Sequence, residues 1–127
     1  MSKGTARRRI QTVAIANRGE VAVRIMHACR ELGIRTVLLH SEVDVLTRAY
    51  RMADVRVCIG PAALNESYLS IENVVNGALA GGADAVHPGF GFLSENADFA
   101  QAVVSAGMIF IGPKPESIRA AGDKISA

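Results

Sequence analysis

The stretch ADAVHPGFGFLSEN, Ala83 to Asn96, indicates the fold because it joins an apolar strand to a helix through a glycine-rich loop. The loop itself is HPGFGFLSEN, His87 to Asn96. Its glycines allow positive φ angles and a close approach of the backbone to another molecule. A plain connector needs turn residues, but it does not need two phenylalanines beside them. The loop is therefore either a binding loop or a tight turn whose aromatic rings fill the local core.

Short apolar segments alternate with helical patterns on both sides of this loop. Nearly unbroken apolar runs are typical of strands buried on both faces, and the predicted strands are 12–16, 36–40, 55–59, 83–87 and 108–111. The predicted helices are 20–33, 46–52, 71–79, 95–106 and 115–121. This alternation predicts an α/β fold, a Rossmann-like parallel sheet of about five strands with helices on both faces.

Serine and glycine mark the ends of several of these helices. Ser70 and Ser94 are placed to cap the helices that follow them, and Gly33 is placed to end the first helix. Apolar residues at helical spacing are expected to face the sheet. In the first and third helices these are Val21, Ile25, Ala28, Cys29, Leu32, Ile71, Val74, Val75, Ala78 and Leu79.

The carboxyl ends of parallel strands share one edge of the sheet, where ligands bind in such folds. The residues that follow the five strands are Asn17, Ser41, Gly60, His87 and Gly112, so we expect them to line this edge. For His87 we expect a role in orienting the turn rather than in proton transfer.

Composition excludes several classes of protein. The 127 residues suffice for one domain with a real core, and half of them are hydrophobic. The net charge is +2, with much of the excess in the basic tail of residues 1–10, so a nucleic-acid partner is not expected. No apolar run reaches the length of about 18 residues that a membrane span needs.

The cysteines and histidines give no sign of a disulfide or a metal site. Cys29 and Cys58 lie in apolar patterns and read as reduced residues of a cytoplasmic protein. The three histidines lack the spacing of metal ligands.

The first strand-to-helix turn, ANRGE, lacks the features of a dinucleotide site. Such a turn needs G-x-G-x-x-G, whereas this one has only Gly19, and Glu20 would repel phosphate. Glu42, near the end of the second strand, could still act as a ribose ligand. A nucleotide-binding regulatory domain thus remains a weaker alternative.

The first helix also has a polar face. Arg24, His27 and Glu31 fall at i, i+3 and i+7 on it. They form either a solvated face or a pairing face, in which a two-fold axis sets Arg24 of one copy against Glu31 of another. A purely structural dimerisation module is therefore a second alternative.

Four motifs, in order, resemble one family. IANRGEVAVRI (15–25), ADVRVCIGP (53–61), HPGFGFLSEN (87–96) and IFIGPKPESIR (109–119), the last followed by GDKISA, are similar to the N-terminal, pre-ATP-grasp domain of biotin carboxylase. The resemblance runs from about Val13 to Ala127. This enzyme module occurs in acetyl-CoA, propionyl-CoA and pyruvate carboxylases.

The resemblance implies a function for the complete enzyme. Such enzymes use ATP and Mg²⁺ to activate bicarbonate and then carboxylate biotin on a carrier domain or protein, which a carboxyltransferase later unloads. The family's GDK lysine, which contacts ATP phosphate, corresponds to Lys124. The residues that correspond to Phe90 and Gly91 lie on a loop facing biotin, although the family usually has tyrosine where this chain has Phe90. Arg24, His27 and Glu31 correspond to the contact face of a homodimer, with His27 in place of a usual arginine.

The same resemblance divides the chain. Residues 11–122 are expected to form the N-terminal domain, and residues 123–127 to begin an ATP-grasp portion, so we expect the natural chain to continue. No catalytic residue and no metal ligand is expected within these 127 residues. The chain alone is predicted to be inactive and to bind no cofactor tightly, while it supplies an active-site wall and a dimer face.

Overall fold

The computed structural model describes residues 9–126, and it describes side chains as far as Gly122. The predicted basic tail, residues 1–10, therefore lies outside the described residues except for Arg9 and Ile10.

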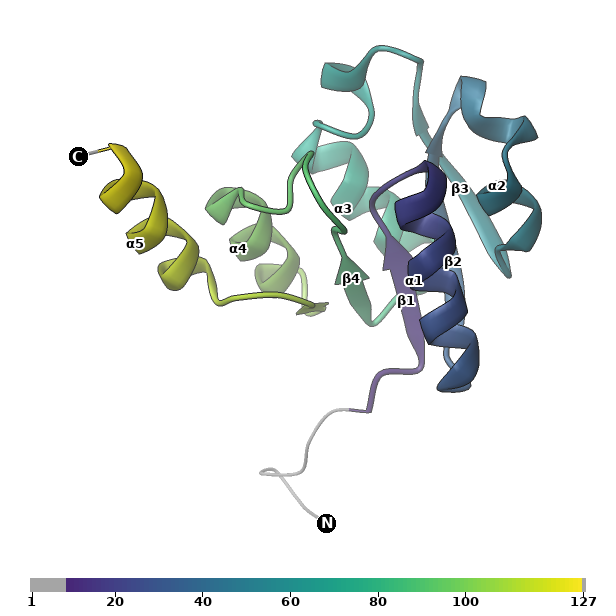
Figure 1. Cartoon of the computed structure of the whole chain (residues 1–127), viewed down its shortest axis with the longest axis horizontal. Helices are drawn as coiled ribbons and strands as arrows, with labels where there is room; N and C mark the ends of the chain where they lie inside the picture. Colours follow the sequence, from purple (N-terminus) through teal and green to yellow (C-terminus); the bar gives the residue numbers. More distant parts are fainter. Residues whose placement is uncertain (1–8, 127) are drawn as a thin grey trace.

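A five-stranded parallel sheet forms the centre of the molecule (Figure 1). Its strands stand in the order β3-β2-β1-β4-β5, and every neighbouring pair is parallel. The fold class predicted from the sequence is confirmed. The bounds are β1 Thr12–Ile15, β2 Arg35–Ser41, β3 Val55–Gly60, β4 Ala85–His87 and β5 Ile109–Phe110.

Helices cover both faces of this sheet, with α1 and α2 on one face and α3 and α4 on the other (Figure 1). Because successive side chains of a strand point to opposite faces, each strand contributes to two cores. In β1, Ala14 packs in the core that includes α3 and α4, while Val13 and Ile15 pack in the core that includes α1 and α2. The helices are α1 Gly19–Glu31, α2 Arg48–Met52, α3 Ile71–Ala80, α4 Ala97–Ser105 and α5 Pro115–Ser126, with short 3-10 turns η1 Glu42–Leu46 and η2 Leu64–Glu66.

Two of the predicted helix starts are wrong. The helix expected over 46–52 is instead η1 followed by α2, because the hydroxyl of Thr47 accepts a hydrogen bond from the Tyr50 N–H (3.2 Å) and starts a new helix. Ser94 does not cap α4, since the side chain of Asn96 accepts from the Phe99 N–H at 2.9 Å. The predicted cap at Ser70 is confirmed.

The buried stripe of α1 differs from the predicted one. Ile25 and Cys29 face the core as expected, but Ala28 and Leu32 are exposed. The sheet-facing stripe is rotated along the helix surface and consists of Ala22, Val23, Ile25, Met26 and Cys29. In α3, Val74 and Ala78 are buried as predicted, whereas Leu79 is exposed.

Gly33 ends α1 as the sequence predicts. It has φ +71°, and its N–H donates to the carbonyl of Arg30 at 3.1 Å. The next N–H, of Ile34, donates to Cys29 at 2.8 Å, which completes a Schellman motif.

The last helix, α5, continues past Ala121, where the sequence predicted its end, to Ser126. It packs beside α4, where Arg119 forms an exposed ion pair with Asp98 (3.2 Å). It lies at the opposite end of the molecule from α2 (Figure 1). It crosses the predicted boundary between residues 122 and 123 without a break, and the division of the chain at that point stays a prediction. Within the described residues, no helix is long and apolar enough to cross a membrane.

Candidate functional site

The strand order places a topological switch point at the carboxyl edge of the sheet, between β1 and β4. In the strand order β3-β2-β1-β4-β5, the chain runs from β1 outward to β2 and β3, and from β4 outward to β5 on the other side. The loops that leave β1 and β4 therefore lead in opposite directions, which is where ligands bind in such sheets. Asn17 follows β1, and the loop from His87 to Asn96 follows β4. The two segments meet through a backbone hydrogen bond from Ala16 to His87 (2.9 Å). The predicted sharing of this edge is confirmed for Asn17 and His87.

The side chain of Asn17 binds the glycine-rich loop directly. Its Nδ2 donates to the carbonyl oxygens of Pro88 at 2.9 Å and Phe90 at 2.7 Å. Its Oδ1 accepts from the Arg18 N–H at 2.8 Å. Asn17 is 2% exposed, so these bonds form away from solvent.

The loop has a backbone that requires glycine. Gly89 and Gly91 have φ +68° and +69°, and Phe92 also has a positive φ of 47°. A Cβ atom at Gly89 would lie 2.6 Å from Nδ2 of Asn17, so no side chain fits there. Phe90 is 78% exposed, whereas Phe92 stacks on the ring of Tyr68 with centroids 5.3 Å apart. One aromatic ring thus packs locally, and the other is available for contact.

His87 orients the start of the loop, as predicted. Its Nδ1 accepts a hydrogen bond from the Gly89 N–H at 3.0 Å. Burial lowers the pKa of His87 below its ordinary value, which favours the neutral ring that this acceptor role requires.

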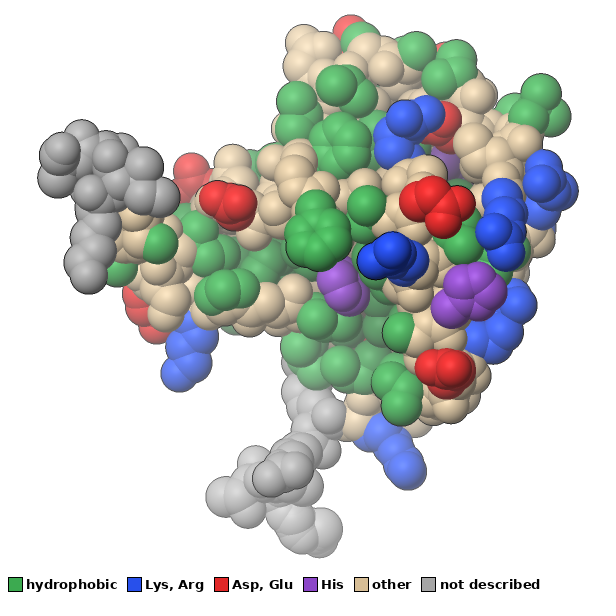
Figure 2. Space-filling view, viewed as in Figure 1, with side chains coloured by type: hydrophobic (Ala, Val, Ile, Leu, Met, Phe, Trp, Pro, Cys, Tyr) green, Lys and Arg blue, Asp and Glu red, His purple; other side chains and the backbone are tan. Residues whose placement is uncertain are grey.

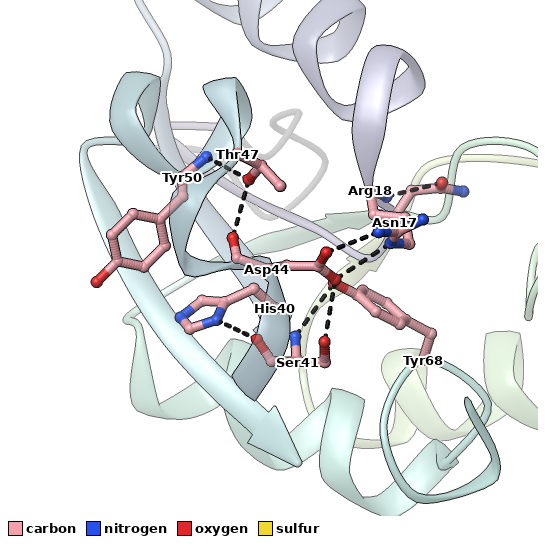
Figure 3. Close-up of polar contacts among 8 residues, drawn as sticks. All are labelled: Asn17, Arg18, His40, Ser41, Asp44, Thr47, Tyr50 and Tyr68. Atoms are coloured by element: carbon pink, nitrogen blue, oxygen red, sulfur yellow. Dashed lines mark hydrogen bonds and ion pairs between the residues drawn. The ribbon is translucent and has the colours of Figure 1, made fainter. Parts of the chain in front are cut away.

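A buried carboxylate lies beside the same edge (Figure 3). Asp44 is 4% exposed, and its Oδ1 accepts from Nη2 of Arg18 at 2.7 Å. Its Oδ2 accepts from Nε of Arg18 (3.1 Å), from the Ser41 hydroxyl (3.0 Å) and from the Tyr68 hydroxyl (2.6 Å). The hydrogen bonds from Arg18 are the largest cause that lowers the pKa of Asp44 to about 2. Burial, followed by the bond to Asp44, raises the pKa of Tyr68 to about 12.

An apolar groove of about 500 Å³ runs between α1 and the loop after β4. Figure 2 shows hydrophobic side chains over this region, with basic and histidine side chains beside them. The groove brings the predicted biotin-facing Phe90 next to Arg24 of the predicted dimer face. Its other lining residues include Val21, Ala28, Leu32 and His87.

The remaining candidate residues lie elsewhere. His27 and Glu31 are exposed on α1 and do not line the groove, and Gly91 is exposed at the tip of the loop. Lys124 belongs to α5, at the far end of the molecule, and its side chain lies outside the described residues. Glu42, the weaker candidate for a ribose ligand, is exposed and takes no part in the buried cluster. Among the residues described, no group of three or more histidine, cysteine, aspartate or glutamate side chains could hold a metal ion.

Sequence reasoning placed Asn17 at this edge but gave its side chain no role, and it did not single out Asp44. A polar residue directly after a buried central strand was the available signal for Asn17. For Asp44 the signal was an aspartate close behind Ser41, itself at the same edge.

Comparison with known proteins decides the family. Residues 9–118 match the family described as biotin carboxylase, N-terminal domain. The chain belongs to this family. It is 56% identical over 118 residues to the biotin carboxylase of Allochromatium vinosum, which covers 93% of this chain and 26% of that protein. It is 48% identical to the propionyl-CoA carboxylase alpha chain of Rattus norvegicus, over 91% of this chain and 16% of the rat protein.

Solved biotin carboxylase domains have the same fold. The biotin carboxylase domain of a thermophilic 2-oxoglutarate carboxylase, bound to ADP, superposes with a TM-score of 0.87 at 44% identity, over 92% of this chain and 26% of that one. Rhizobium etli pyruvate carboxylase also superposes with a TM-score of 0.87, at 42% identity, over 93% of this chain and 12% of that one. This biotin carboxylase N-terminal domain therefore spans about a quarter, or less, of the proteins it matches.

Proposed function

We propose that the complete protein containing this domain is a biotin carboxylase. It uses ATP, Mg²⁺ and bicarbonate to carboxylate biotin held on a carrier domain or protein, and a carboxyltransferase then receives the carboxyl group. The observation that carries this proposal is the family match over residues 9–118. The ADP bound to a related domain supports the use of ATP.

Within that enzyme, residues 9–126 supply one wall of the active site and bind no cofactor tightly by themselves. Phe90 and Gly91 face biotin, and their exposure on a loop held by the buried side chain of Asn17 supports this role. Phe90 offers a ring for packing and, unlike tyrosine, no hydroxyl for hydrogen bonding. Lys124 contacts ATP phosphate as a mobile point charge.

The exposed face of α1 forms part of a homodimer contact. Arg24, His27 and Glu31 are all exposed there, which supports their availability to a second copy. The two free cysteines, buried Cys29 and exposed Cys58, are consistent with a location in the cytoplasm.

The test measures ADP release by the purified complete protein with ATP, Mg²⁺, bicarbonate and free biotin. The expected result is a rate that requires both bicarbonate and biotin, and a rate that ignores biotin would overturn the proposal. The 127-residue chain is the matched control. We expect it to release no ADP, and bicarbonate-dependent hydrolysis by it would contradict the assignment of the catalytic groups to other parts of the enzyme.

Calorimetry with ATP, NAD and biotin distinguishes the two alternatives. Tight NAD binding would favour a nucleotide-binding regulatory domain. Absence of ligand binding, with a mass that depends on concentration, would favour a dimerisation module.

A further inference from the structure

Asn17 bridges the two central strands of the sheet at the point where their connections separate. It follows β1 and bonds to the loop that follows β4, across more than 70 residues of sequence. Both hydrogens of its amide are used, because an asparagine Nδ2 has two donors and here each faces a carbonyl oxygen. The Arg18 N–H fixes the opposite side of the amide through Oδ1.

Only a side-chain amide of this length satisfies all three groups. An aspartate would place carboxylate oxygens against the carbonyls of Pro88 and Phe90, where acceptor faces acceptor. An aliphatic side chain would leave the same carbonyls without their donor, and a buried polar group without a partner is destabilising. The residue at position 17 must therefore supply two hydrogen-bond donors and one acceptor, which most polar side chains do not.

The groups around Asn17 form a closed ring of contacts. Arg18 donates to Asp44 through two nitrogens, and Asp44 also accepts a hydrogen bond from the Tyr68 hydroxyl (Figure 3). Tyr68 in turn stacks on Phe92, at the other end of the loop segment that Asn17 holds. The loop is thus held at Pro88 and Phe90 by Asn17 and at Phe92 by Tyr68.

This double attachment explains how an unusual loop persists. Gly89 and Gly91 adopt positive φ angles without strain, but Phe92 also has a positive φ of 47°, and a non-glycine residue keeps such a backbone only when its surroundings determine it. The carbonyl of Phe90 points inward to Asn17 while its ring is 78% exposed. The direction of that ring consequently depends on the hydrogen bond from Asn17.

We propose that Asn17 is a positioning residue, which holds Phe90 and Gly91 in the orientation that meets biotin in the complete enzyme. The inference rests on the proposed function for the identity of the ligand. It assigns Asn17 no contact with biotin, since the residue acts through the loop. Loss of the two hydrogen bonds should therefore impair the use of biotin far more than the use of ATP.

The kinetic test uses Asn17→Asp in the complete carboxylase, with Asn76→Asp as the matched control on the exposed side of α3. We expect kcat/KM for free biotin to fall about tenfold or more, because small misplacements of a positioning group have effects of that size. The KM for ATP should change by less than about twofold. Equal losses for both substrates would show a general structural role and overturn the proposal, as would an unchanged rate.

A measurement on the unmutated 127-residue chain covers the case in which Asn17→Asp does not fold. In the ¹⁵N spectrum, the side-chain amide protons of Asn17 should exchange slowly with solvent and show contacts to Pro88 or Phe90. The exposed side-chain amide of Asn76 is the fast-exchanging reference. Exchange at Asn17 as fast as at Asn76 would show that Asn17 does not hold the loop, and it would overturn the proposal.

The two tests separate failure of this inference from failure of the proposed function. If the complete protein does not carboxylate biotin, then biotin is no longer the ligand of the loop. Slow exchange at Asn17 would still establish that its side chain holds the loop. A biotin carboxylase with normal kinetics in Asn17→Asp would refute the positioning role alone.

Discussion

The hydroxyl oxygen of Tyr68 lies 2.6 Å from Oδ2 of Asp44, and both residues are almost fully buried. The same hydroxyl accepts the backbone N–H of Ser41 at 3.1 Å. A single phenol therefore satisfies a carboxylate from one side and the end of strand β2 from the other.

Removal of that hydroxyl should destabilise the domain. In Tyr68→Phe, the N–H of Ser41 loses its acceptor, and we expect a loss of about 1 to 3 kcal/mol in the free energy of unfolding. Urea denaturation followed by circular dichroism measures it. Tyr50→Phe is the control, because Tyr50 contacts His40 and Arg56 through its ring, and it should change stability by less than about 0.5 kcal/mol. Equal effects of the two variants would contradict the role of the Tyr68 hydroxyl.

Stability should fall in acid because of Asp44. Its pKa is lowered from 3.8 to about 2 in the folded chain, so its stabilising contribution is complete above pH 3.8 and is lost as pH falls through 2. The contribution is about 2 kcal/mol, reduced to the extent that the half-exposed Arg18 is screened by solvent. Urea denaturation at pH 5, 4, 3 and 2 measures it, and Asp44→Asn should flatten this part of the profile. An equally steep profile in the variant would count against the assignment.

His87→Asn should lower stability more than turnover. The ring holds the turn through the Gly89 N–H, and we expect it to have no proton-transfer role. Because burial lowers the pKa of His87, the unfolded chain takes up the proton first as pH falls below the ordinary value of 6.5. The wild type should therefore lose stability from pH 6.5 downward through the folded pKa, and the variant should lack this component. A stably folded variant with a large loss of turnover would refute the prediction.

Gly89→Ala should destabilise the loop strongly. A Cβ there meets Nδ2 of Asn17 at 2.6 Å and Cγ1 of Val21 at 2.7 Å, and the backbone has φ +68°. Strain and overpacking together predict a loss of about 2 to 4 kcal/mol. Gly82→Ala provides the comparison, since its φ is +78° but the space around it is open, so only the backbone penalty of about 1 to 2 kcal/mol applies. Thermal unfolding of the two variants should rank them in this order, and the reverse order would contradict it.

Arg24→Glu should weaken the proposed homodimer. The side chain is exposed on α1, and reversal of its charge would set it against an acidic partner such as Glu31 of a second copy. We expect the dissociation constant of the complete protein to rise roughly tenfold or more. Sedimentation equilibrium measures it, with Arg48→Glu, at an exposed position of α2, as the control. An unchanged constant would remove Arg24 from the dimer face.

The parallel sheet could be predicted from sequence because its signals are local. A strand buried on both faces needs an unbroken apolar run, and Thr12–Ile15 and Arg35–Ser41 both contain one. The caps at Thr47 and Asn96 were missed because several nearby side chains could accept the same N–H groups. Only the surrounding packing selects among them.

The orientation of α1 was beyond the reach of periodicity. Ala28 and Leu32 have helical spacing and are apolar, yet they are exposed and line the groove. An apolar stripe shows that one side of a helix is hydrophobic. It does not show whether that side packs on the sheet or lines a groove at the surface.

Long-range hydrogen bonds limited how much of the candidate site could be predicted from the sequence. The loop at Phe90 and Gly91 was recognisable from its own composition. The bond from Asn17 to Phe90 spans 73 positions, and the cluster at Asp44 joins three separate segments. No local pattern contains such pairs, so they became visible only with the fold.

The order of the strands also bears on how the domain avoids self-association through its sheet. The two outer strands are β3 and β5, and an unpaired outer strand can recruit a strand from another molecule. β5 has only two residues, too few to serve as a template for pairing. β3 is longer but carries Arg56, whose guanidinium lies over the ring of Tyr50 with 4.8 Å between its carbon and the ring centroid. One outer strand is protected by its shortness and the other by a charge held in place, which should disfavour growth of the sheet into aggregates.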